Sequence, residues 1–379
     1  MRLLLVSNRY PANGADRASP FMPDFVAALV RAGAEVRVVT PDYGARPNEE
    51  TVRVRRFPGT RDRRVVGQLR LWWPPDILDL AGVLRRWRKA VEDDARRMRP
   101  DALLACWALP SGWIARSVAA ECRAPYGVWC LGSDILVWGA HPAGRAWVVP
   151  VLRAATRCWA DGLETAERAT RLAGRSCRFL PSWHELPAPQ ELPIDDPPDS
   201  RMVLSVGRLE KSKGTPTLLA AAERLLASDP AARVHLVGWG ALEDQVARWA
   251  QDPARQGRAR FWGQQPPGPI HFLLKRCACF VIPTTLDSIP ATFGEAVQAG
   301  APLVVSDYGD LPRLVRSHGL GAVFRAGDER DLARVLMETM ERGAAGVDRG
   351  GQARLREEFS PDRAARQVLD ELGADRGHG

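Results

Sequence analysis

Residues 202–214, MVLSVGRLEKSKG, contain the pattern on which the fold prediction rests. A short apolar run, residues 202–206, ends in a turn that carries a glycine and several cations, and residues 214–227 continue with apolar side chains at helical spacing. A buried strand followed directly by a helix is the repeating unit of a parallel α/β sheet. The stretch therefore predicts a strand–turn–helix unit whose turn lies at the carboxyl end of the strand.

The same alternation of short apolar runs and longer amphipathic stretches continues through both halves of the chain, which indicates strands and helices in turn. The predicted strands are residues 3–6, 35–40, 102–105 and 126–130 in the first half, and 202–206, 233–237, 260–262, 279–282 and 303–306 in the second. The predicted helices are residues 20–32, 214–227, 241–249, 269–276, 291–299 and 311–316. The sequence thus predicts an α/β protein with two doubly wound, Rossmann-like domains facing a cleft, where ligands bind at the carboxyl ends of the strands.

A stretch rich in proline and acidic residues, 185–200, separates the two halves, and such a composition is typical of an exposed linker. We therefore expect a first domain over residues 1–184 and a second over residues 201–358. Residues 359–379 are expected to form a C-terminal helix that packs back on the first domain. At roughly 150 residues per domain, a chain of 379 residues fits two domains.

Composition excludes several classes of protein. Hydrophobic residues make up 45% of the chain and charged residues 26%, which excludes disordered, collagen-like and disulfide-scaffold proteins. No apolar stretch reaches the roughly 18 residues of a membrane span, and the apolar run at residues 3–6 is too short for a signal peptide. The seven scattered cysteines lack zinc spacing, so we expect reduced thiols and no metal. The sequence predicts a cytoplasmic protein.

A formal net charge of +8 favours an anionic partner: nucleic acid, an anionic membrane surface or a phosphorylated small molecule. No helix-turn-helix, KH or RNP pattern is present, so we expect no nucleic-acid partner. Residues 61–99 gather eleven basic residues around Trp72, Trp73 and Trp87. This segment suits peripheral association with an anionic membrane or a groove for an anionic acceptor. The alternative is a solvated, salt-bridged helix face, because three acidic residues follow at 92–94.

Missing motifs exclude several enzyme classes. The first strand-to-helix turn lacks G-x-G-x-x-G, and no P-loop, G-x-S-x-G or H-E-x-x-H motif occurs. Gly238-Trp239-Gly240 follows a predicted strand, but Glu243 stands where a third glycine would be, so a dinucleotide site there is weakly supported. The sequence therefore does not support a dehydrogenase, a P-loop NTPase or a hydrolase of a common type.

Two segments of the second half carry candidate chemistry. The turn at 207–214 presents Arg208 and Lys213 just before a helix N-terminus, which suits a diphosphate, although a basic loop with surface ion pairs is the alternative. Farther on, Asp287 lies in a loop and Glu295 in the following helix, so both carboxylates can face one cleft. Carboxylates accept paired sugar hydroxyls and a helix N-terminus takes phosphate, which describes a nucleotide-sugar pocket. A helix-capping Asp287 and a solvated Glu295 are the alternative.

These residues resemble the retaining GT-B glycosyltransferases of the large family 4 type. The motifs Gly207-Arg208, Lys213-Gly214, Glu295-Ala296 and Ala299-Gly-Ala-Pro302 match that family's second domain in order and spacing, and the similarity continues to Asp328. Residues 107–112 and 132–134 are similar to its acceptor-side loops. The resemblance implies a metal-independent hexosyltransferase without a cofactor, which acts in cell-surface polysaccharide or glycolipid synthesis at the inner face of the plasma membrane.

The resemblance also implies roles for individual residues. Arg208 and Lys213 would bind the donor diphosphate and act in catalysis together with Asp287, and Glu295 would hold the ribose. The rest of the implied donor site is Gly14, Gly207, Ser288, Ile289, Pro290, Ala291 and Thr292, and the implied acceptor side is Trp107, Ser133 and Asp134. Because proline has no N–H, the neighbours of Pro290 would supply the phosphate cradle. The implied partners are a nucleotide-diphosphate sugar and a glycan or lipid-linked acceptor.

The chain departs from the family pattern at two positions. Asp287 stands where the family usually has glutamate, and Leu131 stands where many members have histidine. These departures keep two other functions open: a nucleotide-sugar epimerase of GT-B fold, and a catalytically degenerate protein that binds a nucleotide sugar or a membrane surface.

Overall fold

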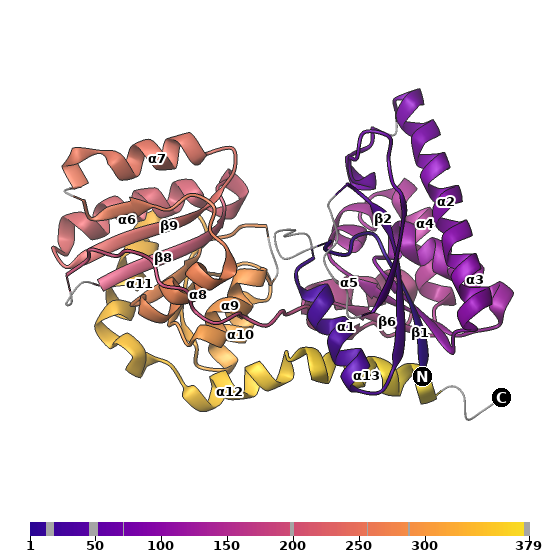
Figure 1. Ribbon diagram of the computed structural model, residues 1–379. Coiled ribbons are helices and arrows are strands. Elements are labelled where there is room, and N and C mark those ends of the chain that lie inside the picture. The colour runs from indigo at the N-terminus through magenta and orange to yellow at the C-terminus, as the bar shows by residue number, and fades with distance from the viewer. Residues whose placement is uncertain are drawn as a thin grey trace. The chain divides into compact units, whose positions relative to one another are not determined.

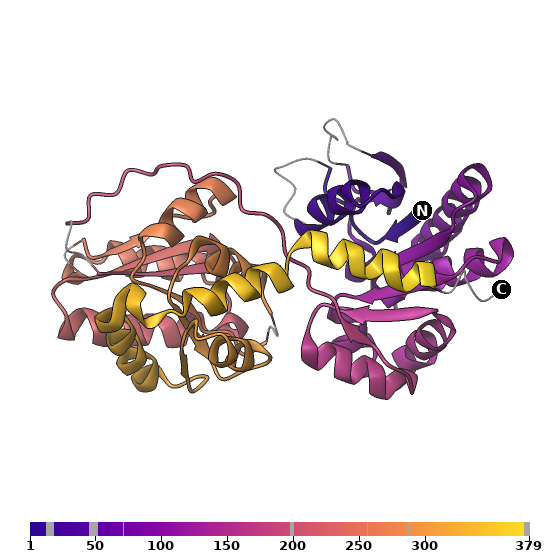
Figure 2. The ribbon, with the colours of Figure 1, turned by 90° about the horizontal axis from the view of Figure 1, so that it is seen from below.

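The computed structural model describes residues 1–12, 19–44, 52–70, 72–197, 201–255, 257–286 and 289–374. It divides into two compact units, one formed by residues 1–184 with 359–379 and the other by residues 185–358. Each unit contains one parallel sheet flanked by helices (Figure 1, Figure 2). The prediction of two Rossmann-like α/β domains is therefore confirmed.

The sheet of the first unit has seven parallel strands in the order β3-β2-β1-β4-β5-β6-β7. These strands are β1 (Arg2–Ser7), β2 (Glu35–Asp42), β3 (Arg53–Pro58), β4 (Ala102–Cys106), β5 (Tyr126–Cys130), β6 (Arg157–Ala160) and β7 (Arg178–Phe179). The helices are α1 (Phe21–Arg31), α2 (Pro74–Met98), α3 (Trp113–Cys122), α4 (Pro142–Ala154), α5 (Leu163–Ala173) and α13 (Pro361–Gly373), with short turns η1 (Val66–Gln68), η2 (Ala108–Gly112) and η3 (Asp134–Trp138). Strand order reverses between β1 and β4.

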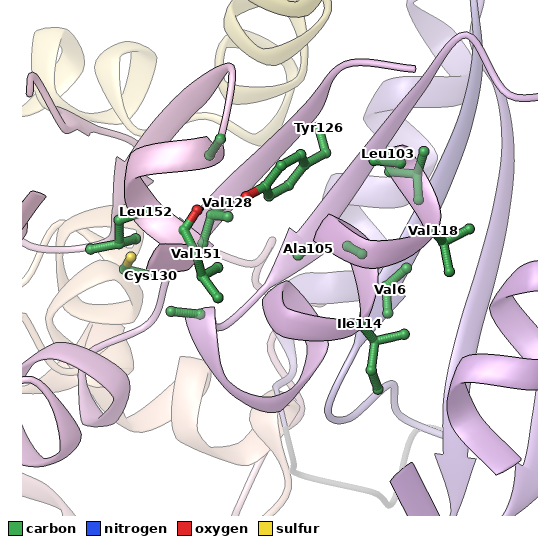
Figure 3. Close-up of a cluster of buried hydrophobic side chains, with 14 of the residues drawn as sticks. Val6, Leu103, Ala105, Ile114, Val118, Tyr126, Val128, Cys130, Val151 and Leu152 are labelled. Atoms are coloured by element: carbon green, nitrogen blue, oxygen red, sulfur yellow. Dashed lines mark hydrogen bonds between the residues drawn. The ribbon is translucent and has the colours of Figure 1, made fainter. Parts of the chain in front are cut away.

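Helices cover both faces of this sheet. Leu4 and Val6 of β1 belong to a core cluster with side chains of α2 to α5, part of which Figure 3 shows. Leu3 and Leu5 alternate with them and pack on the opposite face with side chains of α1 and α13. Burial on both faces explains why β1 reads as a continuous apolar run rather than as an alternating one.

Helix α13, the last element of the chain, packs against the first unit (Figure 2). Val368 and Leu372 are fully buried in the same cluster as Leu3, and Glu371 accepts a hydrogen bond from the indole N–H of Trp159 at 3.1 Å. Helix α13 thus covers one face of the sheet that contains β1, the first strand of the sequence.

The second unit has a six-stranded parallel sheet in the order β10-β9-β8-β11-β12-β13. Its strands are β8 (Arg201–Arg208), β9 (Ala232–Trp239), β10 (Ala259–Phe261), β11 (Cys279–Ile282), β12 (Leu303–Ser306) and β13 (Gly321–Phe324). Its helices are α6 (Thr215–Ser228), α7 (Glu243–Gln251), α8 (Pro267–Arg276), α9 (Ala291–Ala299), α10 (Leu311–Ser317), α11 (Glu329–Arg342) and α12 (Arg349–Glu358), with short turns η4 (Lys211–Lys213), η5 (Pro253–Arg255) and η6 (Gly343–Gly346). Here the strand order reverses between β8 and β11.

The described part of the proline-rich stretch, residues 185–197, has no helix or strand and is held against the second unit. The N–H of Gln190 donates to the carbonyl of Gly268 at 3.0 Å, and Asp196 lies 3.1 Å from the imidazole Nε2 of His235. Burial lowers the pKa of His235, and Asp196 opposes that shift. Among the described helices, none combines the length and the apolar character that crossing a bilayer requires.

Candidate functional site

The carboxyl ends of β8 and β11 adjoin at the point where the strand order of the second sheet reverses. Ligands of open α/β sheets bind beyond the strand ends at such a point. Here the N–H of Thr285 donates to the carbonyl of Ser212 at 3.0 Å, and the Thr285 hydroxyl donates to the same oxygen at 3.1 Å. These bonds join the turn η4, which follows β8, to the loop that follows β11. The two donor-side segments predicted from the sequence therefore form one continuous surface of backbone.

Gly214 makes this junction sterically possible. Its φ is +73°, and a Cβ at this position would lie 1.9 Å from the carbonyl oxygen of Pro283. Only glycine adopts this backbone conformation readily while leaving room for the neighbouring loop.

The two predicted cations lie at this edge of the sheet. Arg208 ends β8 with its side chain about half exposed, and Lys213 ends η4, separated from α6 by Gly214 alone. The guanidinium of Arg208 is 2.8 Å from a carboxylate oxygen of Glu210, whose other oxygen accepts from the Ser212 hydroxyl at 3.3 Å. Sequence reasoning missed Glu210, although an acid two positions beyond the arginine in the same turn was a usable signal.

Helix α9 begins directly beyond the loop that follows β11. Ile289 and Pro290 precede it, and Ala291 and Thr292 form its first turn, whose N–H groups have no acceptor inside the helix. Glu295, the fifth residue of α9, is buried at 7% exposed. Three further predicted site residues, Gly14, Asp287 and Ser288, lie outside the described residues.

The backbones of β8 and β9 also approach each other closely near their carboxyl ends. Gly207 pairs in register with Gly238, and a Cβ on Gly238 would lie 1.8 Å from the carbonyl oxygen of Gly207. Trp239 follows, pairs in register with Arg208, and is 51% exposed. Sequence reasoning considered this tryptophan only as part of a weak dinucleotide motif, because the strand register was not visible to it.

The predicted acceptor-side residues lie at the carboxyl edge of the first sheet. Trp107 follows β4, whereas Ser133 and Asp134 follow β5. Asp134 is 1% exposed, and one carboxylate oxygen accepts from the N–H of Ala108 at 2.7 Å while the other accepts from the N–H of Ile135 at 3.1 Å. Burial raises the pKa of Asp134 to about 6, although the backbone N–H groups oppose this shift. The buried Asp134 carboxylate therefore joins the loop after β5 to the loop after β4. Ser133, its neighbour, is exposed.

Asn8 provides a further link at this edge. It follows β1, donates from its side-chain amide to the carbonyl of Leu109 at 2.9 Å, and accepts from the N–H of Ser111 at 3.3 Å. The turn η2 is thus fixed to the ends of β1 and β5 together. Sequence reasoning did not identify Asn8, because its partners lie about a hundred residues away.

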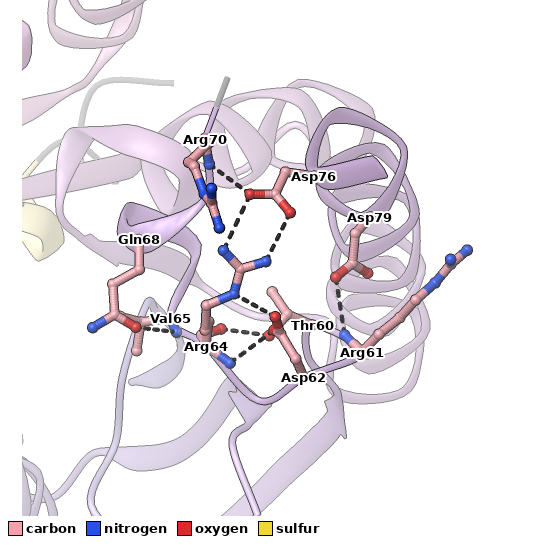
Figure 4. Close-up of polar contacts among 9 residues, drawn as sticks. All are labelled: Thr60, Arg61, Asp62, Arg64, Val65, Gln68, Arg70, Asp76 and Asp79. Atoms are coloured by element: carbon pink, nitrogen blue, oxygen red, sulfur yellow. Dashed lines mark hydrogen bonds and ion pairs between the residues drawn. The ribbon is translucent and has the colours of Figure 1, made fainter. Parts of the chain in front are cut away.

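Part of the basic segment forms a network of hydrogen bonds and ion pairs, called here the Arg64–Asp76 network, before and within the first turns of α2 (Figure 4). Asp76 accepts two hydrogen bonds from the guanidinium of Arg64, at 2.7 and 3.1 Å, and one from the N–H of Arg70 at 2.8 Å. The Arg64 guanidinium holds the pKa of Asp76 below its usual value. Asp79 accepts from the N–H of Arg61 at 2.9 Å.

The two ends of α2 differ in their surroundings. Trp87 is fully buried in the core and Arg88 pairs with Glu92 and Glu121, so this part of α2 fits the salt-bridged interpretation. The segment from 72 to 78, called here the tryptophan tip, is different. Its exposed side chains are Trp72 at 73%, Trp73 at 47%, Ile77 at 45% and Leu78 at 67%.

Within the part of the chain that the structure describes, no three His, Cys, Asp or Glu side chains gather closely enough to hold a metal ion. Six of the seven cysteines are buried thiols, and Cys122 is exposed.

Two family models match the chain. The model described as "Glycosyl transferases group 1" matches residues 191–356, and the model described as "Glycosyl transferase 4-like domain" matches residues 18–183. The two models together span both units of the fold.

Individual proteins agree with the family models. The chain is 25% identical over 344 residues to the putative teichuronic acid biosynthesis glycosyltransferase TuaC of Bacillus subtilis, an alignment that covers 84% of each chain. Its fold is similar to that of Anabaena HepE in complex with UDP, with a TM-score of 0.73 and 17% identity over 99% of this chain and 100% of that one. It is also similar to sucrose-phosphate synthase from Thermosynechococcus elongatus, with a TM-score of 0.74 and 18% identity over the whole of both chains.

Proposed function

The chain belongs to the glycosyl transferases group 1 family of GT-B glycosyltransferases, and we propose that it transfers a sugar from a nucleoside diphosphate sugar to an acceptor hydroxyl with retention at the anomeric carbon. The observation that carries this proposal is the hydrogen-bonded junction between Ser212 and Thr285. This junction brings a turn with two cations beside the loop that leads to the N-terminus of α9, and that combination suits a diphosphate.

The donor diphosphate lies against Arg208 and Lys213, and the N–H groups of Ile289, Ala291 and Thr292 complete its cradle. As the bond to the sugar breaks, negative charge grows on the leaving diphosphate. The fixed positive groups stabilise that charge, so this reaction needs no metal ion. The remaining donor-site roles are those of the family pattern: Glu295 holds the ribose, Asp287 contacts the transferred sugar, and Gly14, Gly207 and Ser288 line the site.

The acceptor is a glycan or a lipid-linked glycan of a cell-surface polysaccharide or glycolipid. Trp107 and Ser133 face it, and Asp134 positions their loops through its bond to the N–H of Ala108. The similarity to a protein named for teichuronic acid biosynthesis supports this class of acceptor.

The tryptophan tip supports peripheral association with the anionic inner face of the plasma membrane. Its indole rings suit the interface between water and lipid. The Arg70 guanidinium lies 5.9 Å from the Trp72 ring centroid. Asp76 and Asp79 are buried, and both accept hydrogen bonds within the Arg64–Asp76 network. Cationic side chains beside the tip therefore meet lipid phosphate without a competing exposed carboxylate from either residue.

Turnover of nucleotide sugars tests the main proposal. The purified wild-type chain is incubated with UDP-, GDP- and ADP-sugars and a glycan acceptor. It should release one of the nucleoside diphosphates, and the new glycosidic bond should have the same anomeric configuration, α or β, as the donor. Arg208→Ala should depress turnover strongly, whereas Arg224→Ala, which removes another half-exposed arginine of a surface pair, should not. An inverted product contradicts retention, an epimerised donor identifies an epimerase, and no turnover of any donor contradicts a transferase.

A further inference from the structure

Trp239 and Arg208 project from neighbouring strands toward the same face of the second sheet. They are register partners on β9 and β8, and partners in a parallel pair have their side chains on one side. Val203 and Val234 belong to the core under α6 and α11, and each lies five residues before Arg208 or Trp239 on its strand. Because side chains alternate along a strand, Arg208 and Trp239 lie on the opposite face.

That opposite face is the one that α8 and α9 cover. Helix α8 packs against β8 and against α9, and α9 carries Glu295. The guanidinium proposed for the diphosphate, the carboxylate proposed for the ribose and the exposed indole of Trp239 therefore all belong to one side of the sheet.

The backbone around Trp239 is fixed from both sides. Its carbonyl accepts from the N–H of Leu209 at 2.8 Å, and the N–H of Gly238 donates to the carbonyl of Gly263 at 2.9 Å. Gly240, with φ +151°, allows the backbone of Leu209 to approach so closely that a Cβ there would lie 2.7 Å from its carbonyl oxygen. Trp239 is thus an exposed aromatic ring on a fixed backbone, so a planar ligand binds it at little cost in conformational entropy.

We propose that Trp239 stacks on the nucleobase of the nucleoside diphosphate donor. The inference rests on the proposed function, because the diphosphate at Arg208 and the ribose at Glu295 determine where the base lies. A base joined to that ribose is the flat, uncharged part of the ligand, and Trp239 supplies a flat aromatic surface beside Arg208. Every base has a π face, so this contact strengthens nucleotide binding without selecting one base.

Isothermal titration of the full chain with UDP, GDP, ADP, the corresponding nucleotide sugars and inorganic pyrophosphate tests this assignment. Trp239→Ala should weaken binding of the preferred nucleoside diphosphate by roughly 5- to 150-fold, the range of one lost base–aromatic stack. Trp239→Phe, which keeps a ring, should recover most of that affinity. Pyrophosphate has no base, so its affinity should be the same in all variants, which also shows that the site is folded. Trp147→Ala, which removes an exposed tryptophan of the first unit, is the matched control.

The outcomes separate this inference from the proposed function. If the wild type binds a nucleoside diphosphate and Trp239→Ala binds it equally well, the stacking assignment is wrong and the donor site stands. If Trp239→Ala weakens the nucleotide sugar but not the nucleoside diphosphate, the indole contacts the sugar and the base assignment is wrong. If the wild type binds none of the three nucleotides, the donor site and the stacking assignment both fail.

Discussion

Gly214 and the carbonyl oxygen of Pro283 are so close that a Cβ on the glycine would lie 1.9 Å from that oxygen. The contact joins two loops that are separated by about seventy residues of sequence. It fixes how near the turn after β8 comes to the loop after β11, and hence the dimensions of the proposed diphosphate cradle.

Replacing Gly214 with alanine should therefore destabilise the second unit and impair the site. A non-glycine residue in such a backbone conformation costs on the order of 1–3 kcal/mol, and the clash with Pro283 adds to it. Urea unfolding and nucleotide titration measure the two effects. Gly327→Ala is the matched control, because Gly327 has φ +79° with no atom within 4 Å of its Cβ position. Equal losses in the two variants would show that the clash is unimportant.

The Arg208–Glu210 ion pair should be weak and replaceable. Exposed pairs of this kind contribute about 0–1 kcal/mol, whereas a hydrogen bond from a cation to a charged ligand contributes roughly 1.5–3 kcal/mol. We expect Glu210→Gln to change nucleoside diphosphate affinity less than about fivefold and Arg208→Ala to reduce it about tenfold or more. Calorimetric titration of each variant with the nucleoside diphosphate measures both changes in affinity. A larger loss in Glu210→Gln would mean that Glu210, rather than the ligand, determines the position of the guanidinium.

Asp134 should make the first unit less stable as the pH rises. Its pKa is about 6 in the folded chain and 3.8 in the reference state, so the folded chain holds the proton more tightly between those values. Stability should fall between pH 4 and pH 6 and lose about 3 kcal/mol, at 1.36 kcal/mol per pKa unit. Asp134→Asn removes this titration. Urea unfolding of both proteins from pH 4 to pH 7.5 should show their difference in stability changing over that window, and a constant difference would contradict it.

The tryptophan tip should direct binding to anionic vesicles. Replacing both Trp72 and Trp73 with serine should abolish most cosedimentation with phosphatidylserine vesicles, because the rings provide the interfacial contact. Arg61→Ala keeps the backbone bond to Asp79 and should weaken binding about fivefold, the effect of one basic residue near such a surface. Trp147→Ser is the control, and equal loss in that variant would point to nonspecific adsorption.

The sequence predicted the central strands and the edge strand β10, but it missed β3, β6, β7 and β13. Strands β1, β4, β8 and β11 are apolar runs buried on both faces, so local composition reveals them. Strand β3 was missed because it is a cationic edge strand, in which Arg55 pairs with Asp93 and Asp94 of α2. Edge strands commonly carry charge. Strands β6, β7 and β13 were also missed, because they lack the adjacent Val, Leu or Ile side chains that reveal the equally short β11 and β12.

The candidate site was predicted where its residues lie in one sequence segment and missed where tertiary contacts define it. The cations of the turn at 207–214 and the start of α9 were found from local motifs. The roles of Trp239 and Asn8 depend on which strand lies beside which, information that a single segment does not contain. The buried position of Asp134 likewise depends on the N–H of Ala108, which belongs to a different loop.

The packing of α13 on the first unit means that two segments far apart in the sequence form one folding unit. During synthesis the second unit, residues 185–358, emerges before α13 does, a delay of about 9 to 35 seconds at typical ribosome speeds. Through that interval the nascent first sheet exposes the apolar face that holds Leu3 and Leu5, while the later-made unit already has its whole sequence. A stop codon after residue 358 would therefore spare the second unit and cause the first unit, which lacks α13, to misfold.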